Sequence, residues 1–86
     1  MKKFKIEINI TGIVQGVGFR PFLFNLARKY GFKGYILNRG NAGVRLVLSG
    51  EKELLNRFVE DIKLKKPKIS YIESISVKKI ETDKDF

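Results

Sequence analysis

Residues 12–22 read GIVQGVGFRPF, a segment in which three glycines precede an arginine and a proline. Successive N–H groups in a glycine-rich turn before a helix form a concave, partly positive donor set that binds anions. The residues that can donate are Gln15, Gly16, Val17, Gly18, Phe19 and Arg20. The Arg20 guanidinium can add paired, charge-assisted hydrogen bonds to phosphate oxygens. The segment therefore indicates a phosphate site that needs no metal, although such glycines are also typical of an ordinary tight turn.

The composition excludes several other kinds of chemistry. Histidine and cysteine are both absent, which removes the commonest general base, thiolate nucleophiles and cysteine-ligated zinc. All nine carboxylates lie at Glu7 or from Glu51 onward. The acid-free stretch between them carries six cations: Arg20, Arg28, Lys29, Lys33, Arg39 and Arg45. We expect this stretch to attract anions and to lack the oxygen ligands of Mg²⁺ or Ca²⁺, so the sequence predicts no metal and no other cofactor.

Hydrophobic periodicity predicts six elements in the order strand, helix, strand, strand, helix, strand. They are a strand over residues 4–11, a helix from Pro21 to Tyr30, strands over residues 33–39 and 43–49, a helix from about Glu51 to Pro67, and a strand over residues 70–80 that contains a bulge. The GNAG segment supplies a hairpin turn between the second and third strands. This order predicts an α+β fold of the ferredoxin-like (split βαβ) type, an antiparallel sheet with two helices on one face.

This topology predicts which chemically useful residues lie together. The first and second strands run parallel with the third between them, so their C-terminal ends share one edge of the sheet. We therefore expect Asn38, at the end of the second strand, to lie beside the glycine-rich turn. An asparagine at this position is also typical of a residue that caps a turn.

The segment GIVQGVGFR, with GYILN some fourteen residues beyond its arginine, resembles the signature of the acylphosphatase family. The resemblance covers nearly the whole chain and implies hydrolysis of a carboxyl–phosphate mixed anhydride without a metal. It implies that residues 15–20 bind the phosphoryl group, and that Arg20 and Asn38 are the catalytic residues, with Asn38 holding the attacking water. Ile36 stands where the family usually has valine. Arg39 and Asn41 follow the family pattern less closely and receive no role.

Two further segments, GVGFRPFLFNLA and KKPKISYIESISV, resemble the N-terminal domain of hydrogenase maturation carbamoyltransferases of the HypF type. The resemblance implies that residues 1–86 form a single acylphosphatase-like domain belonging to a longer protein. Its substrate would then be an acyl phosphate or carbamoyl phosphate, and its partners would be the further domains of the carbamoyltransferase. The family usually closes with a Phe-x-Ile/Val strand, and this sequence stops at Phe86. A stand-alone small acylphosphatase is the alternative.

The net charge of +9 also suits nucleic acid. RNA-binding domains of this fold stack bases on aromatic residues of the central strands, but the third strand, GVRLVLS, has none. This argues against nucleic acid as a partner. A non-catalytic module that binds phosphate needs the same turn and stays an alternative. No apolar run approaches the length of a membrane span or resembles a leader, so we expect a cytoplasmic protein with no membrane partner.

Overall fold

The computed structural model describes residues 3–14 and 18–80, which contain the six predicted elements in the predicted order. The strands are β1 (Lys3–Ile13), β2 (Lys33–Asn38), β3 (Val44–Glu51) and β4 (Tyr71–Ile80). The α-helices are α1 (Phe19–Tyr30) and α2 (Lys52–Lys65). In the described part of the chain, neither helix is long and apolar enough to cross a membrane.

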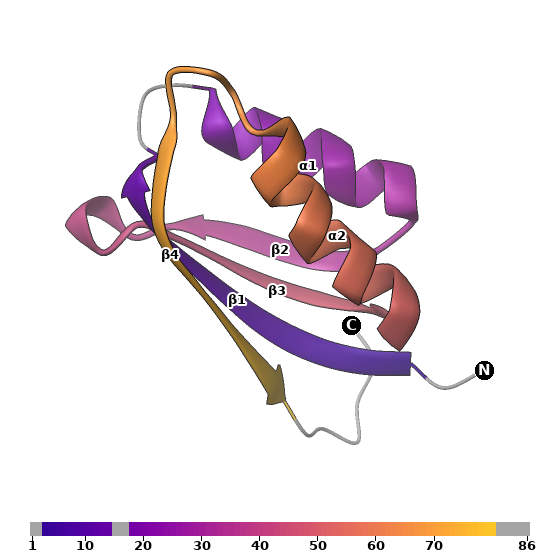
Figure 1. Ribbon diagram of the computed structural model, residues 1–86. Helices are drawn as coiled ribbons and strands as arrows, with labels where there is room; N and C mark the ends of the chain where they lie inside the picture. The colour runs from indigo at the N-terminus through magenta and orange to yellow at the C-terminus, as the bar shows by residue number, and fades with distance from the viewer. Residues whose placement is uncertain (1–2, 15–17, 81–86) are drawn as a thin grey trace.

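The sheet has the order β2-β3-β1-β4, and each neighbouring pair is antiparallel. Both helices lie on one face of this sheet (Figure 1). The predicted α+β, ferredoxin-like fold is therefore confirmed. The bulge predicted for the last strand is confirmed too, because Thr11 pairs with Ser74 and Gly12 with Ile72, which leaves Glu73 without an opposite residue.

The core forms between the helices and one face of the sheet. On β1 the alternating residues Ile6, Ile8 and Ile10 are buried, while the residues between them are polar. This is the period of two that a half-buried strand requires. The helices add a stripe of apolar residues each: Leu23, Leu26 and Ala27 from α1, and Leu55, Phe58 and Ile62 from α2. The other face of the sheet is not covered by a helix (Figure 1).

The connection between β2 and β3 is longer than the tight hairpin that the GNAG segment predicts. It contains a 3₁₀ turn, η1 (Gly40–Ala42), so five residues separate the two strands. Gly43 has a φ of 91°, and a Cβ placed on it would lie 2.0 Å from the Ile10 carbonyl oxygen. Only glycine allows this close approach, which holds the connection against the C-terminal part of β1.

A side-chain contact joins the two helices. The Tyr30 hydroxyl donates a 2.6 Å hydrogen bond to Asp61 Oδ2, and Lys65 Nζ lies 3.6 Å from the same oxygen. The hydrogen bond from Tyr30 lowers the pKa of Asp61, and the carboxylate in turn raises the pKa of Tyr30. A carboxyl group whose pKa is lowered by folding stabilises the folded state above its unfolded pKa, and that contribution is lost as the pH falls through the folded pKa.

We expect Tyr30→Phe to melt at a lower temperature than the wild type at neutral pH, because the variant loses the donor to Asp61. The difference between the two melting temperatures should shrink as the pH falls below about 4, where an unfolded aspartate becomes protonated. Thermal unfolding of both proteins across the acid range measures this. A difference that stays constant down to strongly acidic pH would contradict a role for the ionised Asp61.

Candidate active site

Two buried side chains fix the ends of the glycine-rich turn. Val14, directly after β1, and Phe19, the first residue of α1, are each only 1% exposed and belong to the core. Gln15, Gly16 and Val17 lie outside the described residues, so their predicted part in phosphate binding stays a prediction. The turn therefore starts and ends at anchored positions, and both anchors lie at the edge of the sheet where β1 ends.

The start of α1 presents backbone donors at this edge. Gly18 is the N-cap residue, with a φ of 76° that favours glycine, and its carbonyl accepts the Phe22 N–H at 3.2 Å. Helix geometry leaves the N–H groups of Phe19 and Arg20 without acceptors inside the helix. The first turn of α1 contains no acidic residue. An anion at this end of α1 would meet free donors and the positive end of the helix dipole.

Arg20 lies in the first turn of α1, and its side chain is exposed. Together with Pro21 and Phe24 of the same helix and Ile36 of β2, it lines an open hollow of about 430 Å³. The guanidinium is therefore available to a ligand at the start of the helix. Phe24 was not among the predicted site residues, because it lies outside the apolar stripe of α1. An aromatic residue outside the buried stripe of α1 is the signal in the sequence that could have pointed to Phe24.

The structure brings Asn38 to the same edge. On β3, Val44 pairs with Ile10 of β1 on one side and with Asn38 of β2 on the other. Asn38 is exposed, and its Oδ1 accepts the Gly40 N–H at 2.9 Å. The turn-capping role considered for this residue is thus present. It uses one of the two lone pairs of the side-chain oxygen and leaves the two N–H groups of the amide to act as donors.

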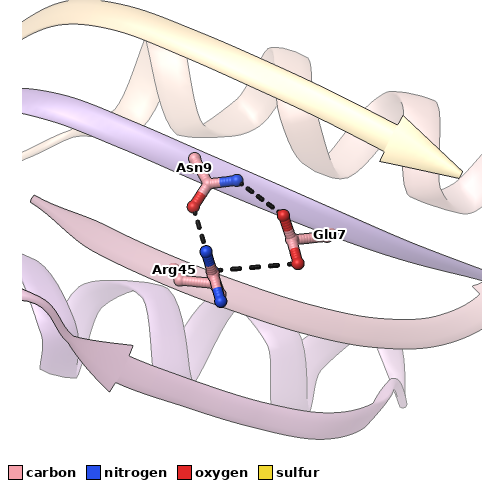
Figure 2. Close-up of polar contacts among 3 residues, drawn as sticks. All are labelled: Glu7, Asn9 and Arg45. Atoms are coloured by element: carbon pink, nitrogen blue, oxygen red, sulfur yellow. Dashed lines mark hydrogen bonds and ion pairs between the residues drawn. The ribbon is translucent and has the colours of Figure 1, made fainter. Parts of the chain in front are cut away.

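Arg45, one of the six cations of the acid-free stretch, contacts other side chains of the sheet. Arg45 Nε donates to Asn9 Oδ1 at 3.2 Å and lies 3.8 Å from Glu7 Oε1, and Asn9 Nδ2 donates to Glu7 Oε2 at 2.9 Å (Figure 2). These three residues lie on the sheet face opposite the helices. The expectation that the whole stretch attracts anions is therefore wrong for Arg45, whose charge is balanced by Glu7 across the β1–β3 pair.

Metal-binding clusters can be assessed only for the described residues. Within residues 3–14 and 18–80, no three or more His, Cys, Asp or Glu residues are grouped so that they could hold a metal ion. Among the described residues, this edge of the sheet includes the backbone donors of α1, Arg20 and the Asn38 amide.

Residues 6–86 match the acylphosphatase family. Over 84 residues the chain is 43% identical to a probable carbamoyltransferase HypF from Methanocaldococcus jannaschii, an alignment that covers 98% of this chain and 11% of that relative. It is 37% identical over 78 residues to an acylphosphatase from Archaeoglobus fulgidus, covering 91% of this chain and 86% of that protein. A crystal structure of full-length HypF in a phosphate- and nucleotide-bound form has a TM-score of 0.89 and 41% identity, over 95% of this chain and 11% of that one.

The fold and the site thus define a small α+β domain that places a helix N-terminus, an arginine and an asparagine at one edge of its sheet. The chain belongs to the acylphosphatase family, a family of hydrolases. It spans 11% of the length of the HypF relative and 86% of the length of the Archaeoglobus acylphosphatase. The resemblance seen in the sequence motifs is therefore confirmed.

We expect Arg20→Ala to bind inorganic phosphate roughly ten- to a hundredfold more weakly than the wild type. This is the loss expected when hydrogen bonds from a charged donor are removed. Titration of phosphate followed by amide NMR shifts measures the affinity. Arg57→Ala, which removes an exposed arginine from α2, is the matched control and should bind as the wild type does. Equal weakening in both variants would mean that phosphate responds only to net charge.

Proposed function

We propose that the domain hydrolyses carboxyl–phosphate mixed anhydrides, either acyl phosphates or carbamoyl phosphate, without a metal ion. The observation that carries this proposal is the pairing of Val44 with both Ile10 and Asn38. It supports a site in which the phosphoryl group lies at the start of α1 and the Asn38 amide faces it from the end of β2. Gln15, Gly16, Val17, Gly18, Phe19 and Arg20 supply the donors for the phosphoryl oxygens.

The chemistry of this substrate class needs few protein groups. The leaving group is a carboxylate, stable as an anion because its conjugate acid has a pKa of about 4, so no general acid has to protonate it. Phosphoryl transfer through a loose transition state depends on positioning and on stabilising charge on the equatorial oxygens. Arg20 and the N–H groups at the start of α1 provide this stabilisation. A sequence without histidine and cysteine is compatible with such a reaction.

Asn38 orients the attacking water in this proposal. Because its Oδ1 holds the Gly40 N–H, its Nδ2 donates to the water oxygen and leaves another lone pair free to attack phosphorus. The amide is neutral and does not repel the phosphoryl group as a carboxylate would. The water oxygen forms the new P–O bond while the bond from phosphorus to the carboxyl oxygen breaks. One water proton passes to a phosphoryl oxygen, so the acyl phosphate dianion gives a carboxylate and dihydrogen phosphate.

The similarity to HypF supports a more specific setting. We propose that this chain works as one domain within a cytoplasmic hydrogenase maturation carbamoyltransferase, where carbamoyl phosphate is its substrate. The 98% coverage of this chain against only 11% of the HypF relative supports that reading. The Archaeoglobus protein, most of whose length is matched, supports the stand-alone acylphosphatase as the second candidate. Both candidates use the same site and the same reaction.

RNA binding receives no support from the arrangement of the sheet. Its open face presents Lys5, Glu7 and Asn9 from β1, and Arg45 and Val47 from β3. In the described part of the two central strands, this face carries no aromatic side chain on which a base could stack.

A non-catalytic module that binds phosphate would use the same residues as the hydrolase. The two differ in turnover, which variants of Asn38 can measure.

We expect Asn38→Ala to lower the rate of phosphate release by about 10²- to 10³-fold, as loss of one preorganised donor typically does, while phosphate still binds. Asn38→Asp separates catalysis from turn capping. It keeps an oxygen that can accept the Gly40 N–H and replaces the donor with a charged oxygen. Steady-state release of phosphate from benzoyl phosphate should therefore be lost in both variants. Activity that survives in Asn38→Asp would show that only the turn matters.

Phosphate release should be unchanged by a metal chelator. The phosphoryl group is bound by amides and a guanidinium in this proposal, so no step passes through a metal ion. Assays with and without excess chelator, on protein checked for bound metals by mass spectrometry, measure this. Activity that is lost with the chelator and restored by a divalent cation would contradict metal independence while leaving the family assignment untouched.

A further inference from the structure

We propose that the hollow between α1 and β2 receives the acyl group of the substrate and that its apolar walls add affinity when this acyl group is apolar. Phe24 is the specificity-determining residue, and the assignment rests on the hydrolase function proposed above. The hollow is continuous with the candidate site because Arg20, which would hold the phosphoryl group, also lines it.

The lining of the hollow matches an apolar group joined to a phosphate. Among the residues that the structure describes, it is lined, besides Arg20, by the apolar residues Pro21, Phe24 and Ile36. The hollow is open to solvent, and its apolar walls lie beside one charged group, a combination also found in small-molecule sites, where a few polar groups fix orientation. A phenyl or alkyl group would cover these walls. The small, polar carbamoyl group would leave them exposed to water.

Phe24 is an unusual residue on the surface of α1. Its side chain is 55% exposed, whereas the neighbouring Leu23 and Leu26 are buried in the core. The guanidinium carbon of Arg28, one helical turn further on, lies 5.8 Å from the centre of the Phe24 ring. This cation–π contact restrains the ring while more than half of the residue stays exposed. The ring therefore lines the hollow beside Arg20.

The position of the hollow agrees with in-line displacement, in which water and leaving group lie on opposite sides of phosphorus. The hydrogen bond from the Gly40 N–H draws the Asn38 side-chain oxygen forward along the chain, toward the β2–β3 connection. Ile36 lies two residues earlier on β2 and on the same strand face. Asn38 follows Ile36 along β2, so a water held by the Asn38 amide and an acyl group over Ile36 would lie at different positions along the strand, which is compatible with in-line displacement.

Tyr71 provides a matched control on the other side of the site. It is an exposed aromatic residue of similar accessibility, 59%, and it pairs with Ile13 at the end of β1. It therefore lies at the same edge of the sheet, but on the β4 side, whereas the hollow lies on the β2 side. Ile72, the next residue on β4, packs against the core, so the Tyr71 side chain lies on the opposite face of the sheet, away from the hollow.

The experiment compares steady-state kinetics of benzoyl phosphate and carbamoyl phosphate for the wild type, Phe24→Ala, Phe24→Leu and Tyr71→Ala. We expect Phe24→Ala to raise KM for benzoyl phosphate about three- to tenfold, the value of one aromatic contact. Its kcat should stay unchanged, because the contact is equal in the ground and transition states. KM for carbamoyl phosphate and the inhibition constant of inorganic phosphate should not change.

The KM of Phe24→Leu for benzoyl phosphate should lie between the values of the wild type and Phe24→Ala. Tyr71→Ala should have the same KM as the wild type. Thermal unfolding confirms that each variant folds.

The outcomes separate the acyl site from the proposed function. Equal changes for both substrates in Phe24→Ala, or none for either, would overturn the acyl site and leave the hydrolase in place. A benzoyl-specific loss in Tyr71→Ala instead would move the acyl group to the β4 side and also overturn it. Failure of the proposed function looks different: the folded wild type would release phosphate from neither substrate, and the acyl site would be withdrawn with it.

Discussion

The candidate site depends on the pairing of β3 with strands on both sides. Val44 faces Ile10 on β1 and Asn38 on β2, so the sheet fixes how far the asparagine lies from the start of the turn before α1. Gly43 permits the connection to pack directly against the Ile10 carbonyl. The core then holds the other partner, since Phe19 anchors the first turn of α1. The residues of the candidate site are thus positioned by main-chain hydrogen bonds and apolar burial.

A site of this kind stabilises charge with fixed groups in place of titrating ones. The backbone N–H groups of Phe19 and Arg20 lie at the positive end of the α1 dipole, and this partial charge does not depend on a titrating side chain. In the described part of the chain, the clearly shifted pKa values belong to Tyr30 and Asp61, which join the two helices. This division of roles suits a substrate whose leaving group needs no proton.

The fold could be predicted because each element carries its own period. Alternating residues on β1 and the apolar stripes of α1 and α2 mark the face that each element buries. The connection between β2 and β3 could not be predicted in detail, since glycines allow several turns and the close approach of Gly43 to the Ile10 carbonyl exists only in the folded sheet. The neutralisation of Arg45 by Glu7 depends on strand register, which pairs residues far apart in the chain. The hollow beside Phe24 also requires a contact between α1 and β2. Arg20 and Asn38, by contrast, were named as site residues from the resemblance of the sequence motifs alone, without knowledge of the turn, the strand register or the hollow.

The most direct test of the account is the fate of oxygen from water labelled with ¹⁸O during turnover of benzoyl phosphate. In the proposed reaction water attacks phosphorus, so mass spectrometry should find the label in inorganic phosphate and not in benzoate. Arg20→Ala and Asn38→Ala should form the labelled phosphate far more slowly. Label in benzoate would mean that water attacks the carbonyl carbon. In that case the phosphoryl-binding edge could not be the centre of the reaction.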